Sequence, residues 1–354
     1  MHNKKILVIS TQLVGGCFQY SNSIIKNWKG DLEIVLPRKG REEDDVIPDW
    51  SIKYVEYNRV VRLFSFLQSL AKIGIGLLNK KYDALFLFGI TKWDYYYLKL
   101  WKLSKLKSFT VIHDGKMHDG EVCEKFQNNM IEIMNTSTHL IFLSEYVHSL
   151  VKEQFNINKP FHIAPHGLIN YGTIQNHEQR VKPIVLFLGR VTKYKGIDTL
   201  LDAIHHVSPD CYLKLIIAGR WDNNMEVVSS TDKIEIVNKY LSNDEILSYI
   251  EISDIMVFPY HEATQSGVAT LAINYLKPSI ITNVGALNEQ FTDKSAVFIQ
   301  PDNPVLLANA IHELCENLTK REEMVEAIKQ ERNKFEWSSI AKDLEMYIAQ
   351  ELQK

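Results

Sequence analysis

The chain has 354 residues, of which 45% are hydrophobic and 23% charged, and its 40 Lys and Arg nearly balance its 43 Asp and Glu. This length suits two domains with an interior each, and the composition excludes a disordered or fibrous protein. The near balance of charge gives no indication of bulk nucleic-acid binding.

The amino terminus, MHNKKILVIS, lacks the apolar core and cleavage site of a secretory signal, so we expect a cytoplasmic location. No uninterrupted apolar stretch reaches the roughly 18 to 20 residues that a membrane span needs, and we expect none. The cysteines form no C-x-x-C pair, which indicates neither a zinc site nor a disulfide framework. They are Cys17, Cys123, Cys211 and Cys315.

Short apolar runs alternate with segments of helical spacing, which is typical of parallel strands covered by helices on both faces. The runs are KKILVIS, LEIVLP, ALFLFG, FTVIH, HLIFLS and FHIAP, then PIVLFLG, LKLIIAG, KIEIV, DIMVFPY, PSIITN and AVFIQ. Residues 167–183 lie between the two sets without periodicity and are the expected linker. The predicted fold class is therefore α/β, with two doubly wound domains that hold the active site between them.

The segment IVLFLGRVTKYKGIDTLLDAI, residues 184–204, predicts a strand, a glycine turn and an amphipathic helix. Arg190 and Lys195 stand in the turn, beside the free N–H groups of the helix, and this pattern favours a diphosphate site. An arbitrary loop with this spacing would more often carry ordinary solvated charges. No P-loop sequence is present to explain the pattern otherwise.

The segment 254–289 predicts a second strand, which ends at Tyr260 and is followed by a polar loop with Glu262. Ser266, Gly267 and Val268 then open another helix, whose bare N–H groups can meet an anion while the carboxylate accepts bonds from sugar hydroxyls. Taken alone, Ser-Gly before a helix is a common cap, and Glu262 would be a solvated loop acid.

Together, these two segments resemble the carboxyl-terminal domain of retaining glycosyltransferases of the GT-B fold, family 4, in the branch with T-Q-S-G-V in the donor loop. The segments LIFLSEYVHSLV, IAPHG and FEWSSIAKDLEMYI extend the resemblance over most of the chain. It implies an acceptor-side Rossmann-like domain at 1–170, joined by a returning helix at about 337–354, and a nucleotide-sugar domain at 183–336. The domains would face a central cleft.

The resemblance also implies the roles of residues. Arg190 and Lys195 would bind the donor diphosphate, and Glu262 would bind the transferred sugar. The other donor-binding positions are Ser266, Gly267, Val268 and Gly219 in the second half, with Gly15 and Gly16 in the first.

One departure from the family concerns a second glutamate, which usually holds the ribose. Leu271 occupies the region where it would fall, and Glu289, after the GALNE turn, would stand nearby in some other role. The ribose contact is therefore not assigned.

In the first half, VIHDGKMHDGE follows a predicted strand and resembles the family's H-D-x-x-x-H segment. The resemblance carries over His118 as a catalytic group facing the donor sugar, with His113 and Asp114 on the acceptor side. Asp119 follows directly. A capped loop explains two such histidines equally well without the resemblance, and a metal site lacks a third well-spaced ligand.

The implied activity is transfer with retention from a nucleotide-diphosphate sugar, which we expect to be a UDP-sugar, to a glycan or lipid-linked saccharide in surface-polysaccharide biosynthesis. Arg190 and Lys195 would stabilise the charge that grows on the leaving diphosphate. No D-x-D triad occurs, and we expect neither a metal ion nor a cofactor.

Two stretches of the first half, residues 59–81 and 92–107, mix Lys and Arg with apolar and aromatic residues. This is typical of helices that lie in a membrane interface, and equally of helices that cover a sheet. Peripheral association with the inner membrane face is therefore an open expectation.

Two alternatives keep the fold and change the function. One is a sugar-nucleotide epimerase or glycan phosphorylase. The other is a non-catalytic module that binds a nucleotide sugar, an alternative that the missing second glutamate leaves open.

Overall fold

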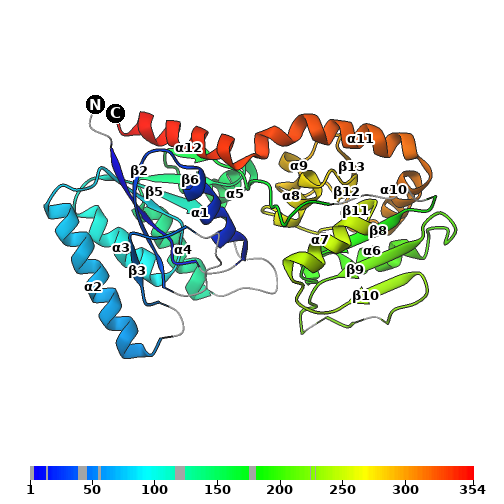
Figure 1. Ribbon diagram of the computed structural model, residues 1–354, viewed down its shortest axis with the longest axis horizontal. Helices are drawn as coiled ribbons and strands as arrows, with labels where there is room; N and C mark the ends of the chain where they lie inside the picture. The colour runs from blue at the N-terminus through cyan, green and yellow to red at the C-terminus, as the bar shows by residue number, and fades with distance from the viewer. Residues whose placement is uncertain are drawn as a thin grey trace. The chain divides into compact units, whose positions relative to one another are not determined.

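The computed structural model describes residues 4–12, 15–38, 46–54, 57–115, 124–174, 181–223, 225–227 and 229–354. This part of the chain forms two compact units (Figure 1). The first contains the described residues within 4–167 together with 336–354, and the second contains those within 168–335. Each unit has its own parallel sheet.

The first sheet has the strand order β3-β2-β1-β4-β5-β6-β7, and every pairing in it is parallel. Its central strands are buried on both faces, as their continuous apolar runs require. The strands are β1 (Lys5–Ile9), β2 (Asp31–Pro37), β3 (Trp50–Ile52), β4 (Ala84–Leu87), β5 (Lys107–Ile112), β6 (His139–Phe142) and β7 (Phe161–Ile163). The helices of this unit are α1 (Gly15–Asn27), α2 (Arg59–Leu78), α3 (Lys92–Lys102), α4 (Glu124–Thr136), α5 (Glu145–Phe155) and α12 (Trp337–Glu351).

The second sheet has the order β10-β9-β8-β11-β12-β13 and is also parallel throughout. Its strands are β8 (Ile184–Leu188), β9 (Lys214–Ala218), β10 (Ile234–Val237), β11 (Ile255–Phe258), β12 (Ser279–Thr282) and β13 (Ala296–Ile299). The helices are α6 (Ile197–Ile204), α7 (Asn243–Ile252), α8 (Gly267–Asn274), α9 (Leu287–Gln290), α10 (Pro304–Glu316) and α11 (Leu318–Glu331), with short 3-10 turns η1 (Lys193–Lys195) and η2 (Arg332–Phe335).

These sheets confirm the predicted α/β class and its two doubly wound halves. All twelve predicted strands are present. The structure adds β3, which is only three residues long and exposes Ser51, so it has no apolar run for a sequence pattern to detect. Because β3 adds one strand to the six that the sequence predicts for the first half, the strand before Arg190 is the eighth in chain order.

The boundary between the units lies between Gly167 and Leu168, three residues earlier than the first domain was expected to end. The reason is packing: Leu168 is buried in the second unit's core, and Ile169 and Tyr171 pack against it. The Tyr171 N–H also donates to the hydroxyl of Tyr275 on the second unit (2.8 Å).

Helix α12 belongs to the first unit, although it follows the whole of the second in the chain (Figure 1). Ile340, Leu344 and Ile348 are buried in the core that α1 and the first sheet form. Near the end of the helix, Glu351 pairs with Nε2 of His139 on β6 (3.2 Å). The apolar stripe of α12 therefore completes this unit's core.

Helix α2 differs from the expectation that no segment has the character of a membrane span. Its 20 residues are long and apolar enough to cross a bilayer by length and composition, although the apolar run is interrupted, and only 22% of its apolar window is buried. Ser65, Ser69, Ile73 and Gly76 form its buried face, with Ile73 in the core beside the first sheet. The helix is thus a surface helix of the first unit.

Candidate functional site

The candidate site of the second unit lies where the order of its sheet reverses. Strands β8 and β11 are neighbours, and successive strands run outward from them in opposite directions. In open parallel sheets of this kind, ligands bind at the carboxyl ends of the strands at the reversal point. Both predicted segments follow these two strands, so their loops begin side by side.

Glycines shape the turn after β8 because backbone passes close to backbone there. Gly189 has φ +116° and Gly219, after β9, has φ +147°. A Cβ on Gly219 would lie 2.0 Å from the carbonyl oxygen of Gly189, so no side chain fits. The role that the structure gives Gly219 is thus close packing of the two turns, and its predicted donor contact stays a prediction.

Lys195 reaches back from η1 to the end of β8 and is buried. Its Nζ and Cγ2 of Val268 each lie 3.2 Å from the point where a Cβ on Gly189 would stand. The ammonium also lies 5.2 Å from the centre of the Tyr260 ring. The glycine turn, the lysine and the first turn of α8 therefore converge, as the two sequence segments predict.

Arg190 is placed differently from Lys195. Its side chain is 48% exposed, and its Nε lies 4.0 Å from Oδ1 of Asp222. The two cations therefore form one buried and one half-exposed position rather than a symmetric pair.

Close backbone packing joins the turn after β8 to the loop after β11. Gly196 has φ +65°, and a Cβ there would lie 1.8 Å from the carbonyl oxygen of Pro259. The His261 N–H donates to the carbonyl of Tyr194 (2.8 Å). The His261 ring also contacts Asp198 of α6, with 3.1 Å between Nε2 and Oδ1. These contacts hold Lys195 beside the loop that carries Glu262.

The amino terminus of α8 is anchored on both sides. The Ser266 hydroxyl accepts from the Ala269 N–H (3.3 Å) as the helix cap. Gln290 of α9 accepts from the Ser266 N–H through Oε1 and donates through Nε2 to the Ser266 carbonyl, both at 3.1 Å. Gln290 is buried and was missed by sequence analysis, because no local pattern connects a glutamine to a loop 24 residues earlier.

Leu271 is buried in the core of the second unit, and Thr270 beside it is fully buried. The Thr270 hydroxyl donates to the Gly267 carbonyl (2.8 Å). Helix α8 itself contains no Asp or Glu, so it offers no carboxylate. Glu262, on the loop before it, is partly buried.

Tyr260 closes the inner side of this site. Tyr260 is buried beside the ammonium of Lys195. Burial raises the pKa of its phenol to about 12, although the neighbouring Ser266 acts to lower it. The ring therefore stays neutral and presents its face to the ammonium.

In the first unit, predicted site residues gather at the carboxyl ends of β1 and β5. Gly15, with φ +79°, and Gly16 are the first residues of α1. His113 follows β5, and Nε2 of His166 lies 4.0 Å from where a Cβ on Gly16 would stand. Asp114 is exposed, and its charge, after burial, helps raise the pKa of Cys17 to about 12.

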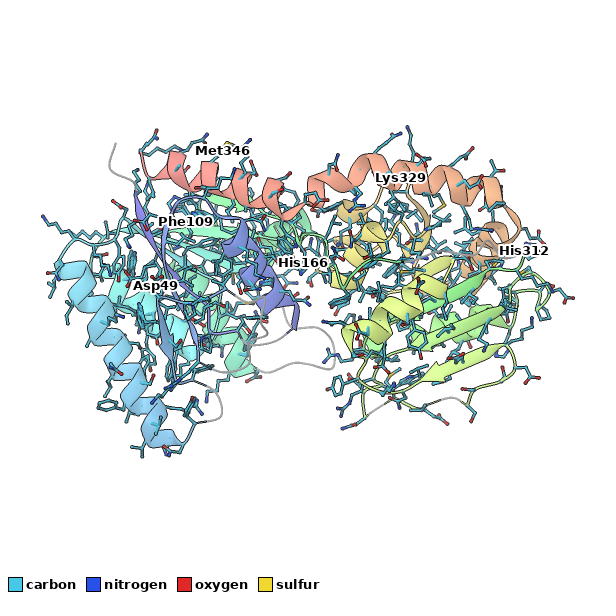
Figure 2. The ribbon with its side chains drawn as sticks, viewed as in Figure 1. Asp49, Phe109, His166, His312, Lys329 and Met346 are labelled. Atoms are coloured by element: carbon cyan, nitrogen blue, oxygen red, sulfur yellow. The ribbon has the colours of Figure 1, made fainter. Side chains whose placement is uncertain are left out.

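Burial disfavours the charged form of both histidines, His113 and His166. Burial, followed by the nearby His166, lowers the pKa of His113 to about 3. Burial also lowers the pKa of His166, which Figure 2 labels. Tyr20 packs on both rings, at 5.0 Å from His113 and 6.0 Å from His166 between centroids. The Nε2 of His113 is shielded from solvent and has no hydrogen-bond partner in the described residues.

His118, the predicted catalytic histidine, lies outside the described residues, as do Asp119 and Cys123. In the part of the chain that the structure describes, no three His, Cys, Asp or Glu side chains group as a metal site would require.

The second unit is similar in sequence to known glycosyltransferases. Residues 174–331 match the family model described as glycosyl transferases group 1. An uncharacterized glycosyltransferase of Methanocaldococcus jannaschii is 31% identical over 156 residues, 43% of this chain and 44% of that protein. The D-inositol 3-phosphate glycosyltransferase of Corynebacterium diphtheriae is 24% identical over 199 residues, 50% of this chain and 47% of that protein. The matches thus span less than half the length of these curated relatives.

Solved structures share the fold over nearly the whole chain. Sucrose-phosphate synthase from Thermosynechococcus elongatus covers 98% of each chain with a TM-score of 0.70 and 14% identity. The Anabaena protein HepE, solved in complex with UDP, covers 98% of this chain and 100% of its own, with a TM-score of 0.74 and 12% identity. The fold is therefore GT-B. The match of residues 174–331 to the glycosyl transferases group 1 model agrees with the predicted resemblance for the second unit at the level of the family, and says nothing of the retaining mode or the branch.

Proposed function

We propose that the protein is a retaining glycosyltransferase that moves a sugar from a UDP-sugar to a glycan or lipid-linked saccharide. The observation that carries the proposal is the burial of Lys195 at the reversal point of the second sheet, against Gly189 and Val268. An ammonium held at the carboxyl end of a parallel strand can bind a diphosphate through charge-assisted hydrogen bonds. The first turn of α8 adds N–H groups to the same place.

In the proposed reaction, the bond between the anomeric carbon and the diphosphate oxygen breaks while the acceptor oxygen bonds to the same face of the sugar. The acceptor proton passes to a phosphate oxygen of the released UDP. Negative charge grows on the diphosphate as the bond breaks, so Lys195 and Arg190 would stabilise the transition state more than the bound donor. Because these cations stand where a metal would otherwise neutralise phosphate, we propose that no divalent ion is required.

The choice of donor and acceptor draws on the similar proteins. HepE was solved with UDP and with UDP-glucose, which supports a UDP-sugar donor. A Klebsiella pneumoniae protein from a cps region is 31% identical over 120 residues, 34% of this chain and 33% of that protein. The lipopolysaccharide outer core galactosyltransferase WaaB shares the fold, with a TM-score of 0.67. These names support an acceptor in surface-polysaccharide assembly, and with it a cytoplasmic protein held at the membrane.

Glu262 is the proposed contact for the transferred sugar, and the His113 and Asp114 edge of the first unit is the proposed acceptor side. The neutral state of His113 suits a hydrogen bond to a hydroxyl group, since no charge has to be desolvated when the acceptor arrives.

The test compares Lys195→Met, which keeps the side chain's bulk, with Lys193→Ala, an exposed cation of the same turn. UDP, GDP and their sugars are screened by thermal shift, and transfer is followed by UDP release with and without acceptor saccharides. Loss of one charge-assisted hydrogen bond predicts UDP binding weaker by about tenfold to a hundredfold in Lys195→Met, with Lys193→Ala unchanged. Arg190→Ala is expected to reduce turnover by a similar factor.

Normal UDP binding and turnover in both Lys195→Met and Arg190→Ala would refute the assigned site. Tight UDP binding by the wild type with no product from any acceptor mixture would favour the non-catalytic alternative.

A further inference from the structure

Helix α2 carries a stripe of large apolar side chains on the face that its own unit leaves uncovered. The stripe consists of residues that are between 55% and 84% exposed: Val60, Leu63, Phe64, Leu67, Ile75 and Leu78. Their spacing follows the period of about 3.6 residues, so they lie on one side of the helix. The buried residues of α2 lie on the opposite side. One face is therefore accounted for by the fold and the other is not.

The stripe stands in a strongly basic part of the chain. Residues 59–81 contain five cations and no Asp or Glu.

 The five cations are Arg59, Arg62, Lys72, Lys80 and Lys81. Two of them lie over aromatic rings of the first unit, with Arg62 at 5.6 Å from the Tyr54 ring centre and Lys72 at 4.4 Å from that of Trp50. A helix with an exposed apolar stripe, in a segment whose only charges are cations, is complementary to an anionic surface that has an apolar interior.

The adjacent helix α3 carries further exposed aromatic and basic side chains. Phe66 of α2 lies 5.7 Å from Tyr96 of α3 between ring centres, and Tyr96 is partly exposed. Lys92 and Lys99 of α3 are exposed, and the Lys99 ammonium lies 4.5 Å from the Tyr95 ring centre. Tyrosines next to lysines favour the headgroup level of a bilayer, where one end of the ring is apolar and the other wet.

A second copy of the chain fits the stripe less well than a bilayer does. Pairing two α2 helices in either direction would bring only cations together at their ends, because residues 59–81 offer no carboxylate. A 20-residue helix is also about 30 Å long and 10 Å wide, so the stripe buries roughly 300 Å² per copy, well below the roughly 800 Å² of a stable interface.

We propose that the exposed stripe of α2 docks the protein on an anionic phospholipid bilayer, with the helix lying in the plane of the headgroups and its cations on the lipid phosphates. The helix does not cross the bilayer, since its opposite face is part of the first unit's core. This inference gives the proposed membrane association a specific surface. Binding to the bilayer is measured without donor or acceptor, so a negative result would leave the proposed transfer reaction untouched. Failure of the transfer reaction would likewise leave the proposed docking surface untouched.

The test is sedimentation of the full chain with vesicles of phosphatidylcholine that contain roughly one third phosphatidylglycerol. The variant Phe64→Glu/Leu67→Glu replaces two exposed residues of the stripe by helix-forming acids and is expected to weaken binding by about tenfold or more. The matched control is Val305→Glu/Leu306→Glu on α10, where two exposed apolar residues lie outside the stripe. It is expected to bind as the wild type does.

A second variant separates charge from apolar contact and protects the test against misfolding. Arg59→Gln/Lys80→Gln leaves the stripe intact and is expected to lose several-fold in binding to the anionic vesicles. Wild-type binding is expected to fall when salt is raised from roughly 0.1 M to 1 M and when phosphatidylglycerol is left out. Circular dichroism establishes that each variant is folded.

Unchanged binding by folded Phe64→Glu/Leu67→Glu would overturn the proposal. So would a wild type that ignores the vesicles and forms a dimer in light scattering that this variant abolishes, because the occupant would then be a second copy.

Discussion

Replacing Gly196 with alanine tests whether close packing between two turns builds the candidate donor site. Gly196 joins η1 to α6 at φ +65°, and an added Cβ would lie 1.8 Å from the carbonyl oxygen of Pro259 and 2.9 Å from its carbon. Both atoms belong to backbone, so no side-chain rotation relieves the contact. The turn that carries Lys195 and the loop after β11 must separate.

The cost has three parts. A left-handed φ costs an alanine about 1–2 kcal/mol relative to glycine. Separation of the loops breaks the bond from the His261 N–H to the Tyr194 carbonyl, worth about 1 kcal/mol. Overpacking adds about 1–3 kcal/mol. The expected loss is therefore about 3 kcal/mol or more, which for a unit of this size lowers the melting temperature by roughly 6–12 °C.

Thermal and urea unfolding of Gly196→Ala measure this loss, and a UDP thermal shift measures its consequence for the site. The control is Gly74→Ala in α2, where an added Cβ meets no heavy atom within 4 Å and alanine favours the helix by about 1 kcal/mol. If Gly196→Ala melts within about 1 °C of the wild type and UDP shifts it equally, the two loops are not coupled as described.

Two further predictions concern the first unit. The pKa of His113 falls from the ordinary 6.5 to about 3 on folding, so the unfolded chain binds more protons below about pH 6.5 and the free energy of unfolding drops as the pH falls, by about 2 kcal/mol at pH 5. In urea unfolding, His113→Gln is expected to show a shallower dependence of that free energy on pH between pH 7 and 5 than the wild type. An unchanged dependence would contradict the burial of His113. Leu344→Ala on α12 is expected to lower the free energy of unfolding by about 2–4 kcal/mol in the same assay, because that leucine is fully buried. Met346→Ala, at an exposed position of the same helix, is expected to stay within about 0.5 kcal/mol of the wild type. Equal effects of the two variants would count against the docking of α12 on the first unit.

Much of the fold was predictable because its signals are local. A strand buried on both faces is a continuous apolar run, so segments such as residues 184–188 and 255–258 stand out in the sequence. The segments with Lys195 and Ser266 were predictable for a related reason, since each follows a strand whose end marks the sheet edge where ligands bind. The short strand β3 was missed because three residues of mixed exposure carry no period.

The sequence by itself determined the order of strands and helices, the glycines of the turns and the residue types at the proposed diphosphate site. Only the tertiary structure decided that Lys195 is buried while Arg190 is half exposed, that Gln290 anchors Ser266, and which face of α2 is covered. The physical reason is that burial depends on neighbours distant in the chain. Helix α2 is apolar on both sides, so its period shows two candidate faces, and only the packing of the first unit selects one.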